Sequence, residues 1–308
     1  MVFSQPRFYT FDELASFARM ASDRFKQERR SEESHWSRVY SKAFSEAEQA
    51  AAEVIRATQG LQDLSSLGAL LGKGYLPIVR YMMRPSVSDD DLSNLTGVAT
   101  RLPVALAKVS SSKAIAEYVA RNVNTDIAPW LKTNTSPSAP DVVAACRAVA
   151  ALMADQKTKT AMRGASSKKQ ERVVRETIVR ECGFATRRGK DFDRLSDIPE
   201  PGVLFERETK VAGAKTDVVL GLYDGRFMAL ECKVSNTELN SVKRLNREAV
   251  EKVVKRRTAF GQNGVVPGVV LQGCFKASDL AKAQDDGAAI FWSLDLAPLV
   301  AFIKGTKA

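Results

Sequence analysis

The spacing of hydrophobic residues in the first half of the chain is that of helices. In residues 11–30 the apolar side chains recur near helical spacing, and residues 46–61 are rich in strong helix formers. Ser88, followed three residues later by Asp91, is a helix-start signal. Almost no run of β-branched residues interrupts this half. We therefore expect residues 1–162 to form a large, all-helical domain.

Two polar segments break this pattern, and the character of the sequence changes after the second. Residues 133–140 (TNTSPSAP) and 162–169 (MRGASSKK) predict loops. Residues 170–182 then predict a short helix that stops at Gly183. We expect a second domain over residues 163–308.

This second half alternates between short apolar runs, which predict strands, and more polar helices. The strand-like runs are FATRR (184–188), VLFERE (203–208), KTDVVLGLY (215–223), RFMALECKV (226–234) and GVVLQGC (268–274). Asp224-Gly225 is a strong hairpin signal. A basic helix is expected from about Thr237 to Arg257, and a closing helix over residues 296–303. The order predicts an α/β fold in layers.

Composition narrows the chemistry that this fold can perform. The chain has one histidine, His35, in a charged segment that we interpret as surface. Sites that need several histidines, and Ser-His-Asp hydrolases, are therefore excluded. The four cysteines are scattered singly, without a Cys-x-x-Cys pair, which argues against structural zinc. The groups that remain for catalysis are carboxylates, lysine and a hard metal ion.

The net charge of +10 favours a polyanionic partner. Residues 161–308 carry 26 of the 46 Lys and Arg residues but only 19 of the 36 Asp and Glu residues, so most of the excess lies there. Solubility alone is the competing explanation. No stretch is long and apolar enough to span a bilayer, and no secretory signal is evident, so we expect a cytoplasmic protein with reduced cysteines.

The predicted hairpin holds the residues that suggest chemistry. Asp217 opens one strand, and Glu231 and Lys233 close the next. Residues two apart in a strand share a face, so Glu231 and Lys233 point together while Leu230 and Cys232 point into the core. Two carboxylates on adjacent strands suit Mg²⁺, and a neighbouring lysine can orient a water or stabilise charge on a phosphate.

A Glu-x-Lys triplet alone is weak evidence, because charged residues often alternate on a solvated strand face. The apolar strands around Asp217, Glu231 and Lys233, and the basic helix that follows, favour a functional site, since burying charge is costly without a role or partners. Lys215 is either a phosphate contact or a simple surface lysine.

Asp217, thirteen intervening residues and then Glu231-x-Lys233 resemble the PD-(D/E)xK nuclease superfamily, with Thr216 in place of the proline of the name. The resemblance implies a mixed sheet flanked by helices, with Asp217 and Glu231 as metal ligands and Lys233 as a catalytic group. The segment 170–184 resembles the opening helix of that superfamily, in which a Glu about twelve residues before a Gly-Phe pair joins the metal site.

That glutamate corresponds to Glu171. Helical spacing places Glu171 beside Val174, Ile178 and Cys182 on the stripe that faces the sheet, with Glu176 nearly opposite. The alternative is an acidic residue in the first helical turn that only complements the helix dipole.

A narrower resemblance covers more of the chain. The segments ALECKVSNTELNSVKRLNRE, VVPGVVLQGCFK, IFWSLDL and RPSVSDDDL resemble the XamI-type family of type II restriction endonucleases. This implies Mg²⁺-dependent cleavage of double-stranded DNA at a specific site, with Mn²⁺ expected to substitute. It also implies a homodimer on a short palindrome, a bacterial host, and a companion methyltransferase that is not a stable subunit.

The residues after the second strand mix cations that bind phosphates with amides that read base edges. With Lys215, the candidates for DNA contact are Ser235, Asn236, Asn240, Ser241, Lys243, Arg244, Asn246 and Arg247. Two other hypotheses remain open: a structure-selective repair or junction nuclease, and a DNA-binding protein without catalysis. A solvated helix face is the alternative for the basic helix.

Overall fold

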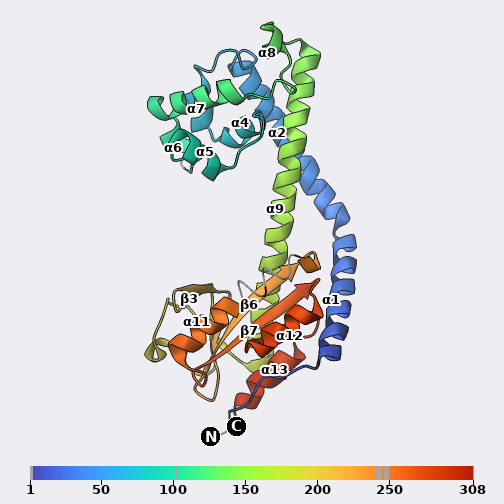
Figure 1. Ribbon diagram of the computed structural model, residues 1–308, viewed down its shortest axis with the longest axis vertical. Coiled ribbons are helices and arrows are strands. Elements are labelled where there is room, and N and C mark those ends of the chain that lie inside the picture. The colour runs from blue at the N-terminus through green and yellow to red at the C-terminus, as the bar shows by residue number, and fades with distance from the viewer. Residues whose placement is uncertain (1–2, 102, 240–244, 246–249, 308) are drawn as a thin grey trace. The chain divides into compact units, whose positions relative to one another are not determined.

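The computed structural model describes residues 3–101, 103–239, 245 and 250–307. It combines many helices with a six-stranded mixed sheet and a separate two-stranded sheet, so the expected α/β class with a large helical region is confirmed (Figure 1). None of the described helices is long and apolar enough to cross a membrane.

The chain divides into two compact units, and the first boundary differs from the expected one. The helical unit is Glu33–Met162; the sheet unit is Met1–Glu32 together with Arg163–Ala308. The sequence pattern groups the first 32 residues with the helical domain. They belong with the sheet because helix α1 (Phe11–Ser31) packs Leu14 and its neighbours into the core of the sheet unit. The second boundary lies where the sequence placed it.

The helical unit is built around one apolar core to which the expected helices contribute. Its helices are α2 (Glu33–Ala57), α3 (Leu67–Gly72), α4 (Leu76–Tyr81), α5 (Asp89–Thr96), α6 (Pro103–Leu106), α7 (Val109–Asn122), α8 (Trp130–Thr133) and the first part of α9 (Ala139–Cys182). The Ser88 hydroxyl accepts the Asp91 N–H at 3.0 Å, which confirms the predicted start of α5. His35 is exposed on α2, as expected.

The second predicted loop is helical. Residues 162–169 lie inside α9, which continues without a break to Cys182 and is followed by Gly183 at φ 71°. The segment contains no proline, and Gly164 is its one strong helix breaker. Because extending an existing helix is much easier than starting one, strong helix formers on both sides carry the helix through this polar stretch. The first predicted loop is observed between α8 and α9.

The large sheet has the strand order β1-β2-β5-β6-β7-β8. Strands β2, β5 and β6 are antiparallel neighbours, whereas β1 pairs with β2, and β6, β7 and β8 pair with one another, in parallel. The strands are β1 (Ala185–Arg187), β2 (Val203–Phe205), β5 (Val218–Gly221), β6 (Phe227–Ser235), β7 (Val265–Gly273) and β8 (Ala289–Trp292). Strands β3 (Thr209–Val211) and β4 (Ala214–Thr216) form a small hairpin that the sequence patterns did not predict.

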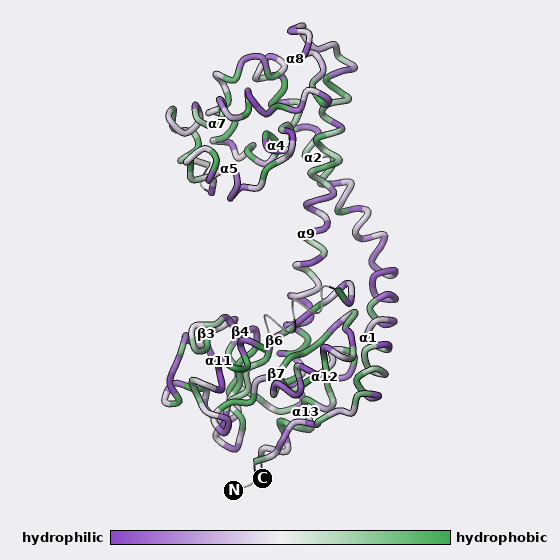
Figure 2. The backbone as a smooth tube through the Cα atoms, in the orientation of Figure 1, coloured by the Kyte–Doolittle hydropathy of each residue, from purple (hydrophilic) through white to green (hydrophobic). Residues whose placement is uncertain are grey.

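Helices cover both faces of the large sheet. The second part of α9 and helix α13 (Ala297–Lys304) share a core with one face. Helices α1, α11 (Glu251–Phe260) and α12 (Ala277–Asp285) pack on the other. Buried on both sides, β6 and β7 are hydrophobic along most of their length (Figure 2). A nearly continuous apolar strand of this kind makes any charged residue within it conspicuous.

The β5–β6 hairpin forms as predicted. Its strands pair antiparallel with Val218 opposite Leu230, and Gly225 adopts φ 86° in the turn. Leu230 and Cys232 face the core beneath α9 and α13, while Ala229 faces α11. The alternation therefore sends the odd-numbered side chains of β6 toward α11.

Candidate active site

The β5–β6 register brings the three predicted site residues together. Asp217 immediately precedes β5 and lies next to Glu231 because Val218 pairs with Leu230. The Lys233 Nζ is 3.1 Å from Glu231 Oε2 and 3.8 Å from Asp217 Oδ2. Asp217 Oδ2 also accepts the backbone N–H of Cys232 at 2.7 Å, which fixes the carboxylate against β6.

Two cations from α11 complete the surroundings of Glu231. The Lys252 Nζ lies 2.6 Å from Glu231 Oε2, and an Arg256 Nη2 donates to Glu231 Oε1. The same Arg256 nitrogen donates to Thr216 Oγ1 at 2.6 Å. The side chains of Glu231 and Arg256 are each 1% exposed, so this is a buried ion pair.

The basic helix was predicted, but neither Lys252 nor Arg256 was singled out. One signal was available: the two residues are four apart, so both project from one face of α11. Their spacing shows that the two side chains share a face of the helix. It does not show which residue they contact, because that residue, Glu231, lies on another element, β6.

Arg175 holds the opposite side of the site. Its guanidinium, projecting from α9, donates to the backbone carbonyls of Phe205 and Asp217. This ties the end of β2 to the residue that precedes β5, so the backbone of Asp217 is restrained from α9. No pattern in the sequence marks Arg175 as part of the site.

The carboxylates differ in how their charges are balanced. Burial, and next the charge of Glu231, raise the pKa of Asp217. Burial alone would also raise the pKa of Glu231, but Arg256, with Lys233 and Lys252, outweighs it and holds that pKa below its usual value. The three cations thus stabilise the ionised form of Glu231, whereas the negative charge of Asp217 is incompletely compensated by its neighbours.

Glu171 lies on the expected face of its helix. Val174, Ile178 and Cys182 are buried beneath the sheet, Glu171 is half-buried, and Glu176 is exposed. The pKa of Glu171 is raised by burial and then by the nearby charge of Asp217. Since Glu171 lies well inside α9 rather than in its first turn, the helix dipole does not explain its position.

The arrangement fits a magnesium ion held by few protein ligands. Within the described residues, no three Asp, Glu, His or Cys side chains form a ready-made metal cage. Mg²⁺ is commonly held by one or two carboxylates, with substrate phosphates and water completing its shell. Asp217 and Glu231 offer such a pair, and a cation would further stabilise the incompletely compensated charge of Asp217.

The residues predicted to contact DNA differ in their exposure. Lys215 is exposed and its Nζ lies 2.8 Å from Glu208 Oε1; Asn236 is exposed and its Oδ1 lies 3.5 Å from an Arg29 nitrogen. Ser235, in contrast to the prediction, has no exposed surface that could contact DNA. Its hydroxyl donates to the Thr237 carbonyl at 2.8 Å, so it stabilises the end of β6. The other candidates lie outside the described residues: Asn240, Ser241, Lys243, Arg244, Asn246 and Arg247.

Known proteins resemble this chain over most of its length. The family described as XamI restriction endonuclease matches residues 59–292. The type II restriction enzyme XamI of Xanthomonas campestris pv. amaranthicola is 30% identical over 265 residues, which cover 86% of this chain and 96% of that enzyme. No solved structure matches the chain.

Proposed function

Because this chain belongs to the XamI restriction endonuclease family, we propose that it is a type II restriction enzyme that hydrolyses double-stranded DNA at a specific site with Mg²⁺. The observation that carries the proposal is the cluster of Asp217, Glu231 and Lys233 at the end of the β5–β6 hairpin. We further propose that the sheet unit is a PD-(D/E)xK nuclease core and that the helical unit contributes DNA recognition, dimer contacts or both.

In this proposal, Asp217 and Glu231 hold the metal, with Glu171 as an auxiliary ligand. A bound Mg²⁺ would supply Lewis-acid chemistry, polarising the phosphodiester and making a nearby water more acidic. Lys233 carries a fixed positive charge between the two carboxylates and is placed to orient the attacking water or to stabilise charge that develops on the phosphate. Arg175 and Arg256 hold the two acidic residues in position.

Double-strand cleavage at a palindromic site calls for two equal active sites. We therefore propose a homodimer, in which a two-fold axis relates the two copies as it relates the two DNA strands. A methyltransferase that protects the same site would belong to the system without being a stable subunit. Mn²⁺ should replace Mg²⁺, because both accept oxygen ligands.

The proposal is tested by incubating the purified protein with unmethylated phage or plasmid DNA, with Mg²⁺ or with a chelator. We expect discrete fragments with Mg²⁺ and intact DNA with the chelator, and the fragment ends would give the site and the stagger. A smear would instead favour a repair or junction nuclease. DNA that is bound but never cut, across several divalent metals, would favour a binding protein without catalysis.

Replacing Glu171 by Gln should lower the cleavage rate by about 10- to 100-fold, the usual effect of losing an outer metal partner. The matched control is Glu176→Gln, which removes the same charge from the exposed side of α9 and should leave the rate unchanged. Rates are compared under single-turnover conditions at several Mg²⁺ concentrations. Equal rates in both variants would remove Glu171 from the metal site.

A further inference from the structure

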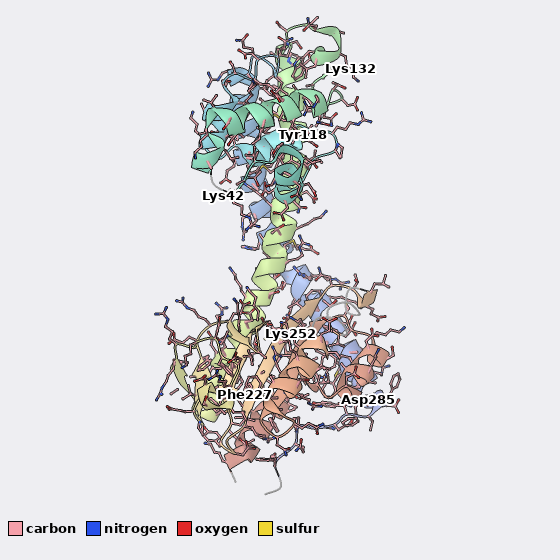
Figure 3. All side chains as sticks on the ribbon, turned by 60° about the vertical axis from the view of Figure 1, so that its left-hand side comes forward. Lys42, Tyr118, Lys132, Phe227, Lys252 and Asp285 are labelled. Carbon is pink, nitrogen blue, oxygen red and sulfur yellow. The ribbon has the colours of Figure 1, made fainter. Side chains whose placement is uncertain are left out.

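Lys252 and Arg256 hold the same carboxylate in different ways. Arg256 is buried, and it is bound to both Glu231 and Thr216. The Lys252 side chain, labelled in Figure 3, is 23% exposed and reaches Glu231 at its Oε2. We infer that Arg256 is a fixed positioning residue, whereas Lys252 is an exchangeable counter-ion that competes with a divalent cation for Glu231. This inference rests on the proposed function of the site.

The Lys252 ammonium occupies the kind of position that a hard cation takes. It lies 2.6 Å from Glu231 Oε2 and also 2.6 Å from the backbone carbonyl oxygen of Lys215, so it is held by oxygens from two elements. The Lys233 Nζ approaches the same Oε2 at 3.1 Å. A divalent ion at that oxygen would meet an ammonium at close range, and the repulsion between them is strong in a partly buried site.

The charge of Glu231 is already compensated without a metal. Among the described residues, three cations, those of Lys233, Lys252 and Arg256, lie within 3.1 Å of its carboxylate oxygens. Adding two positive charges beside these three is unfavourable unless a cation leaves or a phosphate arrives.

Lys252 is the cation most able to leave. Of the three cations bound to Glu231 its side chain is the most exposed, at 23% compared with 14% for Lys233 and 1% for Arg256. A lysine ammonium is strongly hydrated and sits on a flexible stem, so it can return to water at little cost. Arg256 cannot, because leaving Glu231 would strand a buried guanidinium.

A displaced Lys252 would be available to a DNA phosphate. Phosphate binding and metal binding would then favour one another, because each removes a reason for Lys252 to stay on Glu231. The metal-free and DNA-free protein would hold its acidic site closed with its own side chain.

The test is the affinity of the full-length protein for Mn²⁺ without DNA, measured by calorimetry. Lys252→Met should bind Mn²⁺ about tenfold more tightly than the unaltered protein, because the competing charge is gone while the aliphatic stem remains. Lys255→Met removes the same charge from an exposed position on the same helix and should change the affinity by less than about twofold. Lys252→Arg should retain the weak binding of the unaltered protein.

An increase in Mn²⁺ affinity cannot be explained by a damaged fold, because disruption of the site would weaken metal binding. If Lys252→Met proves unstable in chelator, Lys252→Gln serves in its place. Unchanged or weaker binding in the Lys252 variant, or no binding by either protein, overturns the inference. The proposed function is judged separately, by whether the unaltered protein cuts DNA with Mg²⁺, so the two failures are distinguishable.

Discussion

Asp217→Asn should lower the rate of DNA cleavage by about 10³-fold or more while leaving the fold and DNA binding intact. The change removes the negative charge that a metal ion would need, and with it one of the two carboxylates paired with Lys233. The amide oxygen can still accept the Cys232 N–H that Asp217 now accepts at 2.7 Å. Because burial and Glu231 raise the pKa of Asp217, neutralising it also relieves a repulsion.

The matched control is Asp285→Asn, which removes the same charge from an exposed position at the end of α12, apart from Lys252 (Figure 3). Cleavage is followed by the decay of supercoiled plasmid with excess protein, and binding by gel shift in Ca²⁺. The control should cut normally. An Asp217 variant that cuts at the normal rate would contradict the assignment of the site.

Arg256→Met should destabilise the protein by about 3–5 kcal/mol, the range observed when one partner of a buried ion pair is removed. The variant leaves Glu231, whose side chain is 1% exposed, with Lys233 and Lys252 as its remaining cations among the described residues. It also leaves Thr216 without its guanidinium donor. The free energy of unfolding in urea measures the loss. Lys255→Met, on the exposed side of α11, should change it by less than about 0.5 kcal/mol.

A second variant separates the ion pair from the packing of the arginine. In the double variant Glu231→Gln with Arg256→Met, no buried charge is stranded, so more than half of the lost stability should return. If the double variant is as unstable as Arg256→Met alone, the loss arises from packing and not from the ion pair. Because Gln cannot replace a carboxylate at the metal site, the double variant should remain inactive.

Much of the site was evident from the sequence because its strongest signals are local. The Asp224-Gly225 turn and the apolar runs on either side define the β5–β6 hairpin, and the hairpin fixes which residues lie opposite one another. Alternation along β6 then separates Glu231 and Lys233 from Leu230 and Cys232. The helical spacing that groups Glu171 with Val174 is equally local.

Other features of the fold depend on tertiary packing, or on segments too short to give a pattern, and the sequence did not predict them. The apolar stripe of α1 predicts that the helix is buried, but it does not predict which core buries it. The sequence pattern therefore groups residues 1–32 with the helical unit, whereas the structure places them in the sheet unit. Residues 162–169 were interpreted as a loop from their composition, yet the helices on either side continue through them. The three-residue strands β3 and β4 are too short to produce a recognisable alternation.

The sequence by itself determined the α/β class, the hairpin and the grouping of Asp217, Glu231 and Lys233, because each follows from the geometry of one strand pair or one helix. Only the tertiary structure decided that Lys252 and Arg256 neutralise Glu231 and that Arg175 restrains Asp217. The balance of charge around a buried carboxylate depends on side chains from separate elements. Periodicity along the chain carries no information about such distances across the core.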